Sequence, residues 1–94
     1  MDLNSELRLA VDTGNVELGY RNTYKAIVSN NAKLVVVASK GKAELINDIK
    51  HLCKVGNIKV IEFDGNSIDL GGVCGKPYSV NCLAVIEQGN AHLY

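Results

Sequence analysis

The chain has 94 residues, 47% of them apolar, which is enough for one compact hydrophobic core and too little for two. Its 10 basic and 10 acidic side chains sum to zero, so it lacks the positive excess that most nucleic-acid binders carry. No apolar run approaches the roughly 20 residues that cross a bilayer, and no signal-peptide pattern opens the chain, so we expect one domain, residues 1–94, in the cytoplasm.

The first half of the chain is predicted to contain two amphipathic helices joined by a short extended segment at 16–18. The first helix is expected to end at Gly14, where a left-handed helix stop is common, and its apolar face consists of Leu3, Leu7, Ala10 and Val11. The second helix opens just after Gly19 and ends at Asn30 and Asn31. Its apolar stripe consists of Tyr20, Tyr24, Ile27 and Val28.

Strand and helix patterns alternate through the second half. Residues 34–38 are a continuous apolar run, typical of a central strand covered on both faces, and further strands are predicted at 59–63 and 82–86. The loop 39–42 leads into a third helix, stopped by Gly56 and Asn57, whose inward side chains are Leu45, Ile49, Leu52 and Cys53. Asn66 and Ser67 favour the start of a short fourth helix, which Gly71 and Gly72 are expected to break; its apolar residues are Ile68, Leu70 and Val73.

Strands that alternate with helices of this length predict an α/β fold. We expect a three-layer α/β/α sandwich, with helices on both faces of a small mixed sheet and at least one parallel crossover. The same architecture carries response regulators, nucleotide binders and RNA binders, so the fold alone assigns no function.

The cysteines and histidines favour neither disulfides nor a metal site. Cys53, Cys74 and Cys82 are odd in number and have no C-x-x-C spacing. His51 and His92 lie far apart without a ligand grouping around them. We therefore expect reduced thiols and no bound metal.

Motifs of common enzymes are missing. The sequence has no P-loop, no dinucleotide fingerprint and no nucleophile elbow. Gly71, Gly72 and Gly75 with Lys76 resemble a phosphate cradle, but they precede Pro77 and a strand where a cradle needs a capped helix. We predict that the protein is not an enzyme and needs no cofactor.

Charges are distributed unevenly along the chain. Residues 18–43 contain no acid and hold half of the 10 basic residues, namely Arg21, Lys25, Lys33, Lys40 and Lys42. A second acid-free stretch, residues 70–86, contains Lys76. One face can thus be basic while the sum cancels, although solvated faces alone also produce such a pattern.

The segment Gly19 to Thr23 is the first candidate binding site. It places a glycine, a guanidinium and short polar side chains at the opening of a helix, where N–H groups and the helix dipole favour phosphate oxygens. Arg21 and Asn22 can also bond base edges. The alternative is an ordinary capping turn.

The segment Val73 to Val80 is the second candidate. It is a mostly apolar loop that carries one cation, Lys76, and one aromatic ring, Tyr78. Such a loop can receive an unstacked nucleotide, with the ring as a stacking face. Alternatively, Val73, Tyr78 and Val80 close the end of the core.

Both segments occur together, in this order and at this separation, in the L30e ribosomal proteins of the L7Ae superfamily, and the chain resembles their archaeal type over essentially its whole length. The matching segments are GYRNT at 19–23, AKLVVVA at 32–38, DLGGVCGKP at 69–77 and VIEQG at 85–89. The L7Ae branch usually has Asn then Glu at the positions of Arg21 and Asn22, so the resemblance is to the L30e branch.

The resemblance implies a structural protein of the large ribosomal subunit that binds a kink-turn, or a similar internal loop, in ribosomal RNA. A kink-turn bends an RNA helix around tandem sheared G·A pairs and extrudes a nucleotide. By analogy, Gly19 permits close approach of the RNA backbone, Arg21 and Asn22 contact the G·A pairs, and phosphates are held by Lys25, Lys40 and Lys42. The extruded base packs on Val73, Tyr78 and Val80. The candidate RNA-binding residues are Gly19, Tyr20, Arg21, Asn22, Thr23, Lys25, Lys40, Lys42, Val73, Lys76, Tyr78 and Val80.

The expected partners are ribosomal RNA and neighbouring ribosomal proteins, with no membrane, no small-molecule substrate and a monomer when free. One alternative is a kink-turn-binding protein outside the ribosome. Another is a small-ligand or nucleotide-binding α/β domain that uses the 39–42 loop, because doubly wound folds place ligands at the end of such a strand. A third is a protein-interaction module whose partners make the RNA contacts.

Overall fold

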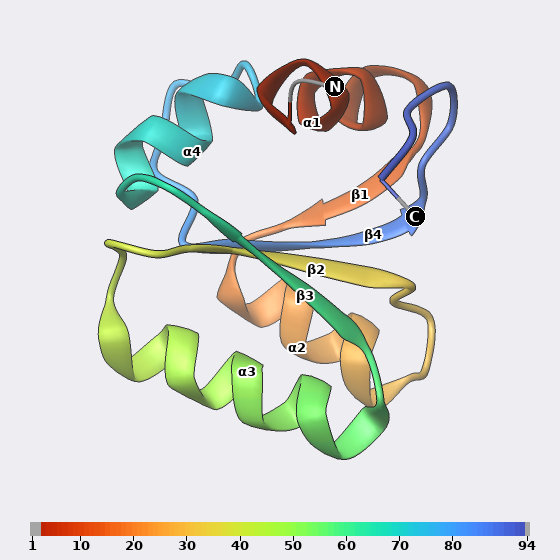
Figure 1. Ribbon diagram of the computed structural model, residues 1–94, viewed down its shortest axis with the longest axis vertical. Helices are drawn as coiled ribbons and strands as arrows, with labels where there is room; N and C mark the ends of the chain where they lie inside the picture. The colour runs from red at the N-terminus through yellow and green to blue at the C-terminus, as the bar shows by residue number, and fades with distance from the viewer. Residues whose placement is uncertain (1–2, 94) are drawn as a thin grey trace.

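The computed structural model describes residues 3–93, which fold into four helices and four strands (Figure 1). In chain order these are α1 (Leu3–Thr13), β1 (Asn15–Leu18), α2 (Tyr20–Val28), β2 (Leu34–Ala38), α3 (Ala43–Gly56), β3 (Lys59–Phe63), α4 (Ser67–Val73) and β4 (Cys82–Glu87). Every helix and strand predicted from the sequence is present, and the bounds differ only at the ends of elements.

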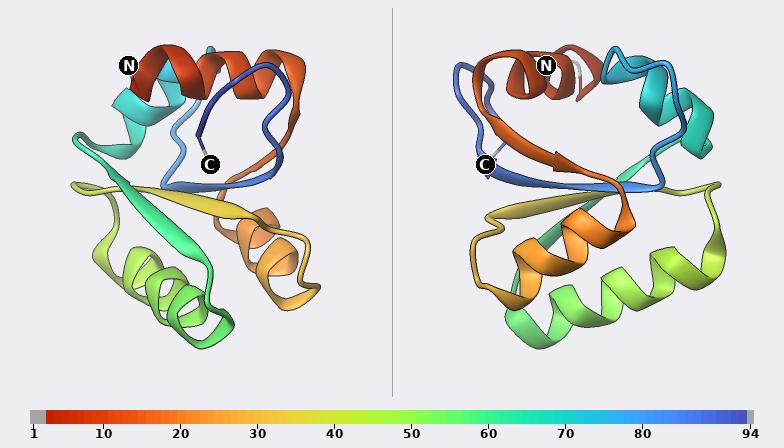
Figure 2. Two further views of the ribbon diagram at one scale, coloured as in Figure 1. Left: turned by 45° about the vertical axis from the view of Figure 1, so that its right-hand side comes forward. Right: turned by 180° about the vertical axis from the view of Figure 1, so that it is seen from behind.

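The strands form one mixed sheet in the order β1-β4-β2-β3. β2 pairs in parallel with β3 and antiparallel with β4, and β1 pairs antiparallel with the other side of β4. α1 and α4 cover one face of the sheet, and α2 and α3 cover the opposite face (Figures 1 and 2). The predicted α/β/α sandwich is confirmed, and β2 is its predicted central strand.

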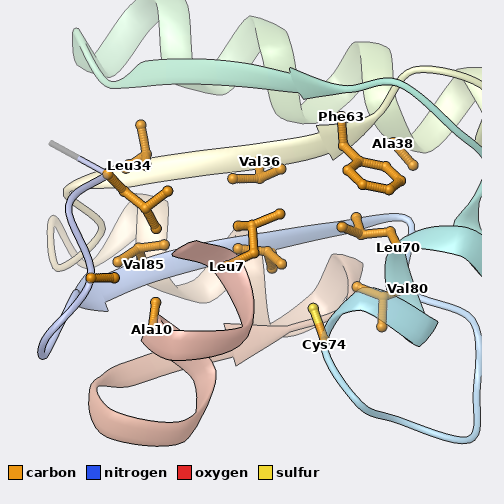
Figure 3. Packing of buried hydrophobic residues seen from close by; sticks show 13 residues of the cluster. Leu7, Ala10, Leu34, Val36, Ala38, Phe63, Leu70, Cys74, Val80 and Val85 are labelled. Carbon is orange, nitrogen blue, oxygen red and sulfur yellow. The ribbon is translucent and has the colours of Figure 1, made fainter. Parts of the chain in front are cut away.

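β2 contributes to both cores because successive side chains of a strand point to opposite faces of a sheet. Leu34, Val36 and Ala38 pack under α1 and α4 (Figure 3), whereas Val35 and Val37 pack against α2 and α3. All five side chains are fully buried. Each fully buried valine or leucine stabilises the fold by about 1.5–3 kcal/mol, which explains why this strand is apolar without alternation.

The apolar stripe predicted for α2 is only partly buried. The residues that α2 buries are Thr23, Ala26 and Ile27, whereas Tyr24 is 42% exposed and Val28 is 59% exposed. Small side chains at Thr23 and Ala26 let the helix approach the sheet closely, so the bulkier tyrosine is left on the flank. The hydropathy pattern found the helix and placed its buried face only in part, because packing against the sheet fixes the rotation of a helix.

Two glycines permit close packing, and only Gly14 stands at the end of a helix, since α1 ends at Thr13. α4 continues through Gly71 and Gly72, so the predicted break is wrong. A Cβ at Gly71 would lie 2.0 Å from the carbonyl oxygen of Tyr78. A Cβ at Gly14 would lie 2.1 Å from the carbonyl oxygen of Glu87, and Gly14 does not adopt the predicted left-handed conformation. Each glycine lets two remote chain segments touch.

Within residues 3–93, the cysteines form no disulfide and no metal site is present. The three cysteines are free and buried, and burial raises the pKa of Cys53 to about 11. Within residues 3–93, no group of three His, Cys, Asp or Glu side chains is placed to hold a metal ion. No helix in this range combines the length and the apolar character needed to cross a membrane.

Candidate nucleic-acid interface

Three segments singled out in the sequence meet at one edge of the sheet. β1 and β2 both end where β4 begins, since Leu18 pairs with Leu83 and Val37 pairs with Cys82. The start of α2, the loop after β2 and the loop before β4 therefore lie at the same edge (Figure 1 and the right-hand view of Figure 2). We refer to residues 19–25, 39–42 and 73–80 as the candidate interface.

Hydrogen bonds from the main chain hold the candidate interface together. The Gly19 N–H donates to the Cys82 carbonyl oxygen at 2.9 Å, and the Ala38 N–H donates to the Asn81 carbonyl oxygen at 2.8 Å. The side-chain oxygen of Asn81 also accepts from the Lys42 N–H at 3.0 Å. Asn81 thus ties the 39–42 loop to the start of β4, a role that no sequence motif indicated.

Gly19 shapes the start of α2. Its backbone dihedrals are φ 93° and ψ 164°, a region that essentially only glycine adopts. No atom lies within 4 Å of the position that a Cβ would occupy, so the space in front of the helix is open. The first N–H groups of a helix have no acceptor within it, and the helix dipole is positive there. A phosphate oxygen fits such an opening.

Four basic side chains of the candidate interface are exposed. Arg21 and Lys25 lie one turn apart on α2, and Lys40 and Lys42 lie on the 39–42 loop. None of the four forms an ion pair within residues 3–93, where the ion pairs join other side chains. This edge is therefore basic although the chain as a whole is neutral.

Two other side chains at the start of α2 already have partners. The Asn22 Nδ2 donates to the Leu18 carbonyl oxygen at 3.0 Å, which holds the turn between β1 and α2. Tyr20 is half-buried on the α3 side of the helix, where its ring lies against Tyr24 and lines a hollow together with Asp48. The side chains of Asn22 and Tyr20 therefore both make contacts within the protein.

Thr23 and Val80 do not offer side chains to a ligand. Thr23 is fully buried against the sheet, with no hydrogen-bond partner of good geometry for its hydroxyl. Burial raises the pKa of the neighbouring Cys82 thiol, and its interaction with Thr23 lowers that pKa in part. Val80 is buried among the core side chains of Figure 3. The predicted surface contacts of these two side chains are wrong, since both belong to the cores.

The loop before β4 carries an exposed apolar groove. Tyr78 is 55% exposed, and it lines this groove together with Ile68, Gly72, Lys76, Pro77 and Ser79. Val73 is half-buried and packs against the core on its inner side. Ile68, one of the apolar residues of the predicted fourth helix, is exposed and borders the groove.

Arg8 is a basic residue beside the same loop that the sequence did not point to. A Cβ at Gly75 would lie 2.6 Å from the Nη1 of Arg8, so the guanidinium lies against the loop backbone. Its Nε also bonds to Asp12 at 3.0 Å. Arg8 belongs to α1, far from the loop in sequence, and only the packing of α1 beside α4 brings them together.

The chain is similar to a known protein family over its whole length. Residues 1–94 match the model described as the ribosomal protein L7Ae/L30e/S12e/Gadd45 family. The chain belongs to this family.

Three relatives are each called large ribosomal subunit protein eL30. The protein of Methanothermobacter thermautotrophicus is 41% identical, over 97% of this chain and 93% of its own length. That of Methanocaldococcus jannaschii is 41% identical, over 99% and 84%. That of Methanosphaera stadtmanae is 36% identical, over 99% and 95%.

In this member of the L7Ae/L30e/S12e/Gadd45 family, most of the site residues that the sequence suggested gather at one edge. The exposed side chains there are Arg21, Asn22, Lys25, Lys40, Lys42 and Tyr78, with Lys76 and Val73 half-buried beside them. Gly19 gives open space, Tyr20 turns to the flank, and Thr23 and Val80 are internal. The edge thus combines a helix N-terminus, four exposed cations and the exposed ring of Tyr78.

Proposed function

We propose that the protein is a structural component of the large ribosomal subunit that binds a kink-turn, or a similar internal loop, in ribosomal RNA. The relatives named large ribosomal subunit protein eL30 support the ribosomal role. The proposed binding site rests on one observation. The start of α2, the 39–42 loop and the 73–80 loop lie together at one edge of the sheet. The protein acts as a single domain in the cytoplasm and is a monomer when free.

The proposed contacts with the RNA are of two kinds, to phosphates and to bases. The open space at Gly19 and the first N–H groups of α2 receive phosphate oxygens, assisted by Lys25, Lys40 and Lys42. Arg21 bonds the edge of a base in the G·A pairs, because its guanidinium can contact two acceptors at once. Phosphate contacts fix the register of the RNA, and base contacts select its sequence.

The extruded nucleotide lies on the loop before β4. Tyr78 offers a stacking face worth about 1–3 kcal/mol for one base. The groove beside it is lined by Gly72 and Pro77, which leave room for a base, and Lys76 stands close by for its phosphate. Val73, and not Val80, supplies the apolar floor, because Val80 is internal.

The protein stabilises the kinked RNA without any chemical step. α2 and the 73–80 loop are held at a fixed separation by the sheet, through the Gly19–Cys82 hydrogen bond at 2.9 Å. A rigid pair of contacts fits the kinked form of an internal loop better than its extended form. Binding therefore shifts the RNA population toward the kink.

The 39–42 loop is poorly suited to the alternative role of a nucleotide cradle. The four main-chain N–H groups of the loop already donate hydrogen bonds inside the protein, to acceptors on Phe63, Gly65, Ala38 and Asn81. A phosphate cradle needs several N–H groups that point at the ligand. Mononucleotides should accordingly leave the thermal stability of the protein unchanged, whereas a bound RNA raises it.

Calorimetric titration at fixed salt tests the proposal. The RNAs are a kink-turn and a control in which its G·A pairs are replaced by Watson–Crick pairs. We expect tight binding to the kink-turn and much weaker binding to the control, since only the kink-turn can adopt the bent shape. Equal, salt-sensitive binding to both RNAs would indicate simple phosphate attraction and contradict motif recognition.

A further inference from the structure

α2 and α3 run side by side on one face of the sheet (Figures 1 and 2). Residues of both helices line a hollow. Its lining residues are Tyr20, Tyr24, Asp48, His51 and Leu52. Tyr20 and Leu52 pack partly against the core beneath, and Tyr24 is largely outside it. The hollow shares Tyr20 and Tyr24 with the candidate interface, and its other lining residues belong to α3.

Two tyrosine rings and one carboxylate surround this hollow. The ring centroids of Tyr20 and Tyr24 are 6.2 Å apart, and the ring planes are tilted by 38°. Asp48 lines the hollow together with both rings. Partial burial, and next the negative charge of the Asp48 carboxylate, raise the pKa of Tyr20. Aromatic faces beside a carboxylate are the combination that attracts an organic cation.

The charges around the hollow also favour a cation over a phosphate. Glu44 and Asp48 lie one turn apart on α3, and both are exposed. Lys50 on the same helix is turned toward β3, where it pairs with Glu62 at 2.7 Å. Lys25 lines a different groove, between α2 and β1. The α3 flank of α2 is therefore aromatic and acidic, whereas the candidate interface is basic.

We propose that this hollow binds an arginine side chain from an extended basic segment of a neighbouring protein. The guanidinium stacks on a tyrosine ring and donates two parallel hydrogen bonds to Asp48. A lysine ammonium is compact and cannot make both contacts, so arginine is preferred. Arginine binding in the hollow does not require bound RNA. Both partners can be bound at once, because the arginine occupies the α3 side of α2 and the RNA occupies the N-terminal end of α2.

The test is a titration of the isotope-labelled full chain, followed by nuclear magnetic resonance. The probe is a short arginine-rich peptide with blocked ends, and the control peptide carries citrulline, which has the shape of arginine without its charge. We expect saturable shifts of the Tyr20, Tyr24, His51 and Leu52 signals with the arginine peptide. The citrulline peptide should leave these signals in place.

Two variants with the same change in net charge separate a site from general attraction. Asp48→Asn should weaken peptide binding about tenfold, which corresponds to the loss of the charge pairing with Asp48 while the stacking on the tyrosine ring remains. Asp12→Asn removes a carboxylate from α1 on the other side of the sheet, and it should leave the affinity unchanged. Equal weakening by both variants would overturn the proposal, because only the total charge would then matter.

Titrations with RNA distinguish the two classes of partner. We expect the arginine peptide to bind equally well when the protein is saturated with kink-turn RNA. A single-stranded RNA that shifts the same four signals, more strongly in Asp48→Asn than in the original chain, would show that the hollow is an RNA surface and would overturn the proposal. If the kink-turn itself did not bind, the peptide result would still stand, so failure of one proposal is distinguishable from failure of the other.

Discussion

Single side chains on the first turns of α2 differ in what they can recognise. Arg21 presents a planar guanidinium that can bond two acceptors of a base, whereas Lys25 is a point charge suited to phosphate. We expect Arg21→Ala to weaken kink-turn binding by about 1–3 kcal/mol, measured by calorimetry. Because Arg21 is exposed and forms no ion pair within residues 3–93, the free energy of unfolding should change by less than about 0.5 kcal/mol.

Two further substitutions serve as controls for Arg21. Arg21→Lys keeps the charge and loses the planar geometry, so it should bind nearly as weakly as Arg21→Ala. Lys25→Ala should mainly lessen the salt dependence, by about one unit of slope, with little change in selectivity. Full binding by Arg21→Lys would mean that residue 21 contacts only phosphate.

The buried thiols link stability to alkaline pH. Burial, with a smaller contribution from Cys82, raises the pKa of Cys53 from 9.0 to about 11, and burial also raises the pKa of Cys74 and of Cys82. The folded protein holds these protons more tightly than the unfolded chain does. The free energy of unfolding should therefore be greatest below pH 9.0 and fall as the pH rises toward about 11, as checked by urea denaturation at each pH.

Cys53→Ala provides the control for this pH dependence. Truncating one buried thiol should lower the stability at neutral pH, because the small cavity costs packing. Its stability should then decline less steeply between pH 9.0 and about 11, since one titrating group is gone. An unchanged slope would assign the decline to lysines or tyrosines.

The element α4 forms in spite of two glycines. Its N-terminus is capped reciprocally: the Asn66 side chain accepts from the Asp69 N–H at 2.8 Å, and the Asp69 carboxylate accepts from the Asn66 N–H at 3.2 Å. The two glycines in its last turn have different surroundings. A Cβ at Gly71 would meet the Tyr78 carbonyl oxygen, whereas no atom lies within 4 Å of one at Gly72.

Because of this difference, alanine at the two positions should change the free energy of unfolding in opposite directions. Gly72→Ala should raise the free energy of unfolding by about 0.5–1 kcal/mol, because alanine costs less backbone entropy in a helix. Gly71→Ala should lower it by about 1–3 kcal/mol, since the 73–80 loop must move away. Thermal denaturation checks both, and equal effects of the two would contradict the close approach at Gly71.

Residues 90–93 pack on the α1 side of the sheet, away from the candidate interface. The Asn90 N–H donates to the Thr13 hydroxyl at 3.0 Å, and the His92 N–H donates to the Glu6 carboxylate at 2.6 Å. Leu93 is buried in the core cluster under α1. This segment therefore contributes to stability without touching the proposed RNA site.

Truncation of Leu93 should separate stability from RNA binding. Leu93→Ala should cost about 2–3 kcal/mol of unfolding free energy and lower Tm by roughly 10 °C. Below the transition, its affinity for the kink-turn should match that of the original chain. Val55→Ala, which truncates a side chain that is 74% exposed on α3, should leave both quantities nearly unchanged. A loss of RNA affinity in folded Leu93→Ala would mean that the two edges are coupled.

The order of helices and strands was predictable because each is encoded by a local pattern. The valine-rich run at 34–38 can be satisfied only by burial on both faces, and it forms the central strand. The apolar stripe that begins just after Gly19 predicted the start of α2. Local spacing and backbone preference were sufficient for these predictions.

Which side chains face outward, and which segments meet, depends on how the helices pack on the sheet. Thr23 and Val80 lie inside, Ile68 lies outside, and Arg8 joins a loop that is remote in sequence. The rotation of a helix about its axis, and the distance between two loops, depend on the sizes of side chains on other elements. Local patterns therefore predicted the helices and strands, their order and the family. Packing of α1, α2 and α4 against the sheet fixed the surface that a partner can reach.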